Sequence, residues 1–230
     1  MDPNNLIKVI TAIFTVVFAI LAAVIEIKKN PKYWLNRFFG MFFVFAALGF
    51  LFYTIYHLIF TDADLVIVFA TVGQVCFNIA MGCLLQSELI VEYSEKVALN
   101  KRYILMNILL FVVSTFGYVI WPIQVNMDAY VIEEVDTITK PFLFYPVFLY
   151  RIILMLYVVI KFSVLSKKTS GTSRQQLMLF TYGMICIILG TLLTLLGGSL
   201  LDILETIGLL AFDVGAVIIL RGFLLKQEKF

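Results

Sequence analysis

The sequence has few charged residues. Lys, Arg, Asp and Glu make up 14% of its 230 residues, whereas 62% are hydrophobic and the mean hydropathy is +1.02. A soluble domain has about 25% charged and about 45–50% apolar residues, and a globule of this size cannot hide the excess apolar surface from water. The composition therefore excludes a soluble domain and predicts an integral membrane protein.

The chain is also poor in the residues that build metal and catalytic sites. It has one histidine, His57, which excludes a haem held by two histidines. Its three cysteines, Cys76, Cys83 and Cys186, lie inside apolar runs, which is typical of small buried side chains and not of disulfides. There is no H-E-x-x-H motif, Ser/His/Asp set or glycine-rich phosphate loop. We therefore expect no enzyme, no metal, no cofactor and no nucleic-acid partner.

Long apolar runs dominate the sequence. A helix needs about 20 apolar residues to cross the hydrocarbon core, and backbone groups in lipid must bond within the segment, which favours helices. The runs are too continuous for the alternation of a transmembrane β-barrel. We predict an all-α membrane protein, in which residues 1–230 form a single seven-transmembrane helix bundle. Its helices are expected at residues 6–27, 38–60, 65–92, 103–123, 142–165, 177–196 and 203–225.

Basic and acidic residues alternate between the loops. The basic residues lie in the first, third and fifth loops and in the tail: Lys28, Lys29, Lys32, Arg37, Lys96, Lys101, Arg102, Lys167, Lys168, Arg174, Lys226 and Lys229. The other loops carry Asp62, Asp64, Asp128, Glu133, Glu134, Asp136 and Asp202, with Lys140 as their one base. Because basic loops stay in the cytoplasm, the N-terminus is expected outside and the C-terminus in the cytoplasm. We predict a multi-pass protein of the cell membrane.

Two segments extend beyond the expected membrane core. The outer loop at 124–141 contains "YVIEEVDTI", which predicts a short hairpin or an amphipathic cap over the helix ends. The third helix continues past the membrane, where Glu88, Glu92 and Glu95 share one face and Glu92 is spaced to pair with Lys96. We interpret that acidic face as solvated helix surface.

Two charges lie at similar depth near mid-membrane. Arg151 is about nine residues, or about 14 Å, from the outer start of the fifth helix, and Asp213 is about ten residues from that of the seventh. Each is the lone charge in the middle of its helix. An isolated charge in low dielectric costs several kcal/mol, so we expect Arg151 and Asp213 to pair directly or through a ligand or water. Such a pair is either a structural clamp or part of a site.

The third helix carries a polar stripe. Ala70, Gln74, Asn78 and Gly82 recur every four residues and share one face. Small residues allow close helix approach and amides bond across it, which predicts a central helix. The stripe either lines a cavity or holds helices together.

Aromatic residues gather toward the expected outer side. His57 adjoins Tyr53 and Tyr56 on the second helix, which indicates either an interfacial aromatic belt or a pH-sensing or ligand-contacting histidine. Pro122 and Pro146 are expected to end or kink the fourth and fifth helices. Together the aromatic side chains predict an outward-facing pocket above Arg151 and Asp213, lined by Tyr53, Tyr56, His57, Tyr118, Trp121 and Tyr150.

Three segments resemble the seven-helix membrane sensor region of bacterial and archaeal histidine kinases. They are "NPKYWLNRFFGMFFVFAALGFLFYTIYH", "SRQQLMLFTYGMICIILG" and the terminal "DVGAVIILRGFLLK". The resemblance implies a prokaryotic sensor whose last helix leads to a cytoplasmic output. Because no kinase follows in this sequence, the expected partner is a separate cytoplasmic or membrane protein, beside the lipid bilayer and possible further copies of the chain.

A narrower resemblance links "LETIGLLAFDVGAV" to helix seven of the microbial rhodopsins. There an Asp is followed four residues later by the lysine that binds retinal. Here the Asp is Asp213 and the slot holds Val217, so retinal is not expected.

The leading hypothesis is a receptor or sensor that binds a small ligand in the outward-facing pocket. A seven-helix transporter is the alternative, since sugar transporters share this length and topology. Their two repeats carry matching prolines, whereas Pro146 has no counterpart in the first helix. A structural subunit of a membrane complex also fits the absence of a catalytic set.

Overall fold

The structure is a computed structural model that describes residues 3–58, 62–127, 137–197 and 202–225. Its elements are α1 (Pro3–Lys29), α2 (Trp34–Leu58), α3 (Ala63–Tyr93), α4 (Glu95–Ala98), α5 (Lys101–Ile120), β1 (Gln124–Val125), β2 (Thr137–Ile138), α7 (Pro141–Lys168), α8 (Gly171–Gly197) and α9 (Asp202–Leu224). In these described ranges, seven helices are long and apolar enough to cross a membrane. The prediction of an all-α protein with seven apolar spans is confirmed.

The helix ends differ from the predicted ones by one to four residues, except the start of α8, which differs by six. α5 ends at Ile120 and not at 123, because Pro122 lacks the N–H needed to continue the helix. α8 begins at Gly171 and not at 177, since the polar residues ahead of the apolar run also adopt the helical conformation. The lengths of the apolar runs thus located the membrane spans, but they did not reveal where polar residues extend a helix.

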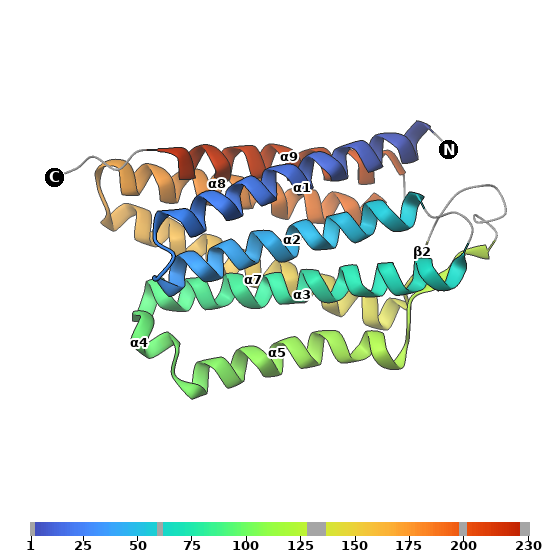
Figure 1. The fold of residues 1–230 in the computed structure, drawn as a ribbon, viewed down its shortest axis with the longest axis horizontal. Helices are drawn as coiled ribbons and strands as arrows, with labels where there is room; N and C mark the ends of the chain where they lie inside the picture. The colour runs from blue at the N-terminus through green and yellow to red at the C-terminus, as the bar shows by residue number, and fades with distance from the viewer. Residues whose placement is uncertain (1–2, 59–61, 128–136, 198–201, 226–230) are drawn as a thin grey trace.

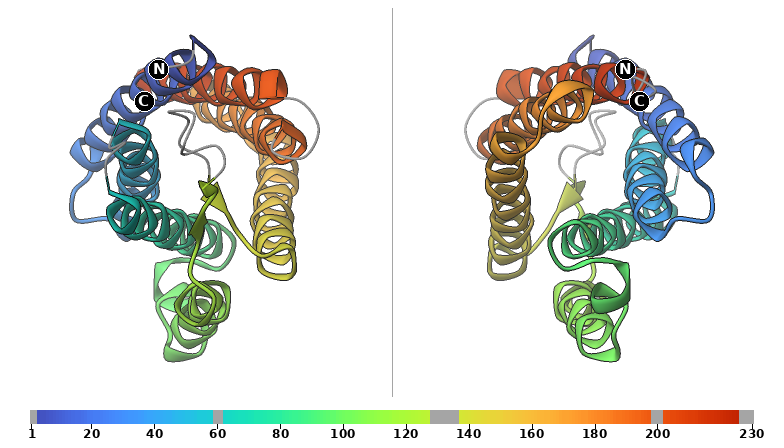
Figure 2. Two further views of the ribbon diagram at one scale, coloured as in Figure 1. Left: turned by 90° about the vertical axis from the view of Figure 1, so that its right-hand side faces the viewer. Right: turned by 90° about the vertical axis from the view of Figure 1, so that its left-hand side faces the viewer.

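Six of the long helices form a closed circuit. Each packs on the next in the order α1, α2, α3, α7, α8 and α9, and α9 returns to α1 (Figure 2). α5 lies outside this ring against α3, with Ser114 and Tyr118 as its buried residues. α3 therefore contacts three long helices, α2, α5 and α7.

The chain begins and ends at opposite ends of the bundle. α1 starts at one end, called here the Pro3 end, and α9 finishes at the other, the Leu224 end (Figure 1). At the Pro3 end β1 pairs antiparallel with β2, with Gln124 opposite Ile138 and Val125 opposite Thr137. A hairpin base thus forms inside the predicted outer loop, and residues 128–136 of that loop lie outside the described residues.

α8 and α9 approach each other through facing glycines. A Cβ built on Gly183 would lie 2.6 Å from the carbonyl oxygen of Gly215, and one on Gly190 would lie 2.7 Å from that of Gly208. Such distances leave no room for a side chain, so the two backbones are in direct contact. In lipid, where apolar surface gains little by leaving the solvent, this close packing is what holds helices together.

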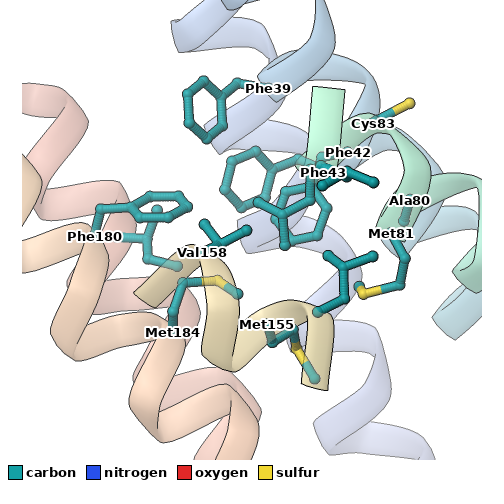
Figure 3. Close-up of a cluster of buried hydrophobic side chains, with 14 of the residues drawn as sticks. Phe39, Phe42, Phe43, Ala80, Met81, Cys83, Met155, Val158, Phe180 and Met184 are labelled. Carbon is teal, nitrogen blue, oxygen red and sulfur yellow. The ribbon is translucent and has the colours of Figure 1, made fainter. Parts of the chain in front are cut away.

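The half of the ring toward the Leu224 end is filled by aromatic and methionine side chains. Phe39 of α2 packs edge-on against Phe180 of α8, with ring centroids 5.3 Å apart. Met155 and Val158 of α7 and Met184 of α8 fill the space beside them (Figure 3). The three cysteines are free, with Cys76 and Cys83 buried.

Candidate functional site

Arg151 of α7 is buried, and its guanidinium binds two amide residues of α3. Its Nε and Nη2 donate to Oδ1 of Asn78 at 2.9 and 2.7 Å. Its Nη1 donates to Oε1 of Gln74 at 2.9 Å, and Nη2 also donates to the Gln74 carbonyl oxygen at 3.1 Å. The side chain is 6% exposed. The α3–α7 interface is therefore fastened at mid-depth by one cation and two amides.

The same amides also bind α5. Asn78 Nδ2 donates to the carbonyl oxygen of Ser114 at 3.0 Å and to Oγ1 of Thr115 at 3.2 Å. The Tyr118 hydroxyl lies 3.5 Å from Gln74 Oε1, to which it donates. Since each of the two amides binds both Arg151 of α7 and a residue of α5, the predicted stripe holds three helices together.

The positive charge of Arg151 is met by neutral groups. Its guanidinium carbon lies 5.6 Å from the ring centroids of Phe77 and of Phe148, which is within cation–π range. Among the described residues, no carboxylate lies within ion-pair distance of it. Amide oxygens and aromatic faces therefore stabilise the charge without cancelling it.

The predicted direct pair between Arg151 and Asp213 is wrong. Asp213 instead accepts a hydrogen bond of 2.6 Å from the hydroxyl of Thr15 on α1. The two charges share a depth, but α8 stands between α7 and α9 in the ring. Depth along a helix follows from residue number, whereas the neighbour that a helix face meets is decided by how the helices are arranged.

Val217 occupies the position that would carry a retinal lysine, and its side chain is 44% exposed. Val214 beside it is 54% exposed. This face of α9 therefore points away from its helix neighbours.

Polar residues at the Pro3 end join α1, α2 and α9. Lys8 forms an ion pair with Glu205 at 2.6 Å, and the Tyr53 hydroxyl donates to the other oxygen of Glu205 at 3.2 Å. The sequence analysis did not identify this group, because Lys8 and Glu205 both lie near the starts of their helices and not at mid-membrane. The signal was available, since Lys8 and Glu205 lie at comparable short distances from the starts of their helices.

His57 is part of the aromatic cluster on α2. It is buried, and its Nδ1 donates to the carbonyl oxygen of Tyr53 at 2.9 Å, because a carbonyl can only accept. Its ring lies 4.2 and 4.4 Å from the ring centroids of Tyr53 and Tyr56. Tyr56 also belongs to a buried cluster that contains Tyr118 of α5 and Val147 of α7, whereas no α2 residue lines the groove that holds Trp121 and Tyr150.

A groove of about 360 Å³ lies between α5 and α7 toward the Pro3 end. Trp121, Phe142, Pro146 and Tyr150 are among its lining side chains, and Trp121 packs edge-on against Phe142. The Tyr150 hydroxyl is buried and has no hydrogen-bond partner in the part of the chain that the structure describes. Of the predicted pocket residues, Trp121 and Tyr150 thus line this groove, while Tyr118 belongs to the Arg151 network.

The acidic face of α3 is solvated surface only in part, because Glu92 is exposed whereas Glu88 is buried. Glu88 is 1% exposed, and its Oε2 lacks a hydrogen-bond partner within the described ranges. Glu92 forms an ion pair with Lys161 of α7 and not with Lys96, and it accepts a hydrogen bond from the Tyr157 hydroxyl at 3.3 Å. These residues form a second polar layer between α3 and α7, nearer the Leu224 end.

No known protein-family model matches this sequence. A comparison with curated proteins likewise finds no match.

Proposed function

We propose that the chain is a membrane receptor for an apolar, bilayer-soluble molecule that carries a hydrogen-bond acceptor. The ligand enters the groove between α5 and α7, and the response passes to a separate cytoplasmic or membrane protein. One observation carries this proposal: Tyr150 lines an apolar groove, and its buried hydroxyl has no hydrogen-bond partner among the described residues. An unsatisfied buried hydroxyl costs about 1–3 kcal/mol, which a ligand with an acceptor regains.

The groove is linked to the Arg151 network. Ser114 lines the groove, and its carbonyl oxygen accepts the hydrogen bond from Asn78. Tyr150 directly precedes Arg151 in α7. A ligand that moves α5 or α7 must therefore disturb the bonds of Asn78. The bound and unbound conformations then differ in these bonds, and a ligand that favours one conformation shifts the equilibrium between them.

The α3–α7 interface supports a route from the groove to the Leu224 end. α7 is one continuous helix from Pro141 to Lys168. Arg151 lies in the polar layer nearer the Pro3 end, and Tyr157 and Lys161 lie in the layer nearer the Leu224 end. A shift of α7 along α3 changes both layers together. A sensor of this kind agrees with the resemblance to histidine-kinase membrane regions.

The filled Leu224 half of the ring favours a receptor over a carrier. Phe39, Phe180 and Met184 occupy the interior through which a solute would pass (Figure 3). Opening such a route would require breaking the packing of α2, α7 and α8, whereas a receptor needs only a shift of α7.

Binding can be tested with a matched pair of probes, 2-tridecanone and tridecane, on the purified protein. The ketone has an acceptor and the hydrocarbon has none. We expect the ketone to bind the wild type about tenfold more tightly than Tyr150→Phe, because one hydrogen bond is worth about 1.4 kcal/mol. Tyr145→Phe, an exposed tyrosine of the same helix, is the control and should bind like the wild type. Equal ketone affinity in wild type and Tyr150→Phe would refute the assignment.

The response can be measured separately from binding. A bimane label on Lys168→Cys, at the end of α7, reports on the Leu224 end of the helix. The ketone should change its emission in the wild-type background and not with Tyr150→Phe. Tight binding with unchanged emission would leave a lipid-binding protein without the receptor function.

A further inference from the structure

A second pocket, of about 220 Å³, lies between α7 and α8 at the Leu224 end. Its lining consists of Ser163, Ser166, Lys167, Arg174, Met178, Thr181 and Tyr182. Hydroxyl groups and two cations thus surround one small cavity on the outside of the ring. It shares no residue with the groove between α5 and α7.

Thr181 of the pocket wall has a buried hydroxyl that lacks a partner among the described residues. Its side chain lies in the pocket wall and is 6% exposed, and no residue that the structure describes accepts a hydrogen bond from its hydroxyl. The Ser166 hydroxyl is already engaged, since it donates to the Ser163 carbonyl oxygen at 2.8 Å. Thr181 is therefore a buried donor in the pocket wall whose hydroxyl can bind an acceptor without giving up another bond.

The two cations of the pocket have no acidic partner. In the described part of the chain, neither Lys167 nor Arg174 forms an ion pair with a carboxylate. Lys167 lies in the last turn of α7 and Arg174 near the start of α8, so the α7–α8 turn brings them to the same cavity. Two positive charges at one cavity favour the binding of an anion.

We propose that this pocket binds the phosphate group of an anionic membrane lipid. Arginine and lysine are the usual partners of phosphate oxygens, and a hydroxyl donor such as Thr181 completes the set. Basic pockets between transmembrane helices bind lipid headgroups in this way. Met178 and the exposed Tyr182 continue the wall along α8 with apolar surface, where the acyl chains of the lipid lie. The proposal is independent of the receptor function and of the orientation of the bundle.

The test is lipid binding to the purified full chain in detergent, followed by native mass spectrometry and by the shift of Tm. The lipid is dioleoyl phosphatidylglycerol. Lys167→Gln with Arg174→Gln is expected to raise its apparent Kd at least tenfold. The matched control is Lys101→Gln with Arg102→Gln, which removes the same charge from the start of α5, where the pocket has no lining residue. This control should bind like the wild type.

Thr181 supplies a second comparison that leaves the charge unchanged. Thr181→Val is expected to raise the Kd several-fold, whereas Thr181→Ser keeps the hydroxyl and should stay near the wild-type value. Equal affinity of all variants for phosphatidylglycerol would overturn the proposal. Inorganic phosphate forms a separate arm and should not shift Tm at matched concentration. A shift with phosphate alone, and none with phosphatidylglycerol, would overturn the assignment to a lipid.

Discussion

Arg151 links α7 to α3 in the middle of the bundle. Its buried charge is stabilised by four hydrogen bonds to Gln74 and Asn78 and by two aromatic faces. Removing one partner of a buried charge is costly, because the charge then remains unsatisfied in a low dielectric. The amides of Gln74 and Asn78 should therefore contribute more to the stability of the protein than amides that bind neutral groups.

Asn78→Leu is expected to destabilise the protein by about 3 kcal/mol, because it removes two of the bonds to the guanidinium and leaves the charge poorly satisfied. The measurement is unfolding in a denaturing detergent titration. Asn107→Leu is the control, since Asn107 bonds only the neutral acceptors Gly82 and Gln86, and it should cost about 1 kcal/mol. Equal losses at the two positions would contradict a special role for the charge.

Arg151 and Asp213 should behave as independent residues. Their partners lie on different helices, α3 for Arg151 and α1 for Asp213. A double-mutant cycle of Arg151→Met and Asp213→Asn is expected to give a coupling energy below about 0.5 kcal/mol. A coupling above about 1.5 kcal/mol would restore the ion pair that the sequence suggested.

At the scale of elements, the tightest contact is between α8 and α9. Gly183 and Gly190 meet Gly215 and Gly208 with no space for a Cβ. This differs from Gly73 of α3, where an added Cβ would lie 3.4 Å from its nearest atom, the Gly49 carbonyl oxygen. The two kinds of buried glycine should therefore respond differently to the same change.

Gly183→Ala should lower stability by about 1–2 kcal/mol, because the new methyl group collides with the backbone of α9. Gly73→Ala should be neutral or stabilising, since alanine favours the helix by about 1 kcal/mol and fits its site. Detergent unfolding of the two variants measures the difference. A larger loss at Gly73 than at Gly183 would argue against the close α8–α9 contact.

At the scale of the whole molecule, the ends of the bundle differ in charge. The basic loops predict that the Leu224 end lies in the cytoplasm and the Pro3 end outside. Lys32 and Lys140 are exposed residues at opposite ends, before α2 and before α7. They offer a matched pair for testing the orientation.

In intact cells, an impermeant maleimide should label Lys140→Cys and should label Lys32→Cys only after the membrane is permeabilised. The native cysteines are replaced beforehand. The reverse pattern would invert the predicted orientation, and with it the side from which the proposed receptor transmits its response.

The sequence by itself determined the seven helices and their approximate ends. Apolar length and the internal hydrogen bonding that lipid demands are local properties, so each span could be located from its own residues. It also identified Arg151, Gln74 and Asn78 as buried polar residues worth attention, because polar groups at that depth are rare and need partners.

Only the tertiary structure decided which partners meet. The ring order places α3 beside α7 and puts α8 between α7 and α9, so Arg151 binds amides while Asp213 binds Thr15. The burial of Glu88 and the pairing of Glu92 with Lys161 depend on the same arrangement. Residue spacing fixes depth and relative face within a helix, but the neighbour of each face depends on the packing of all helices together.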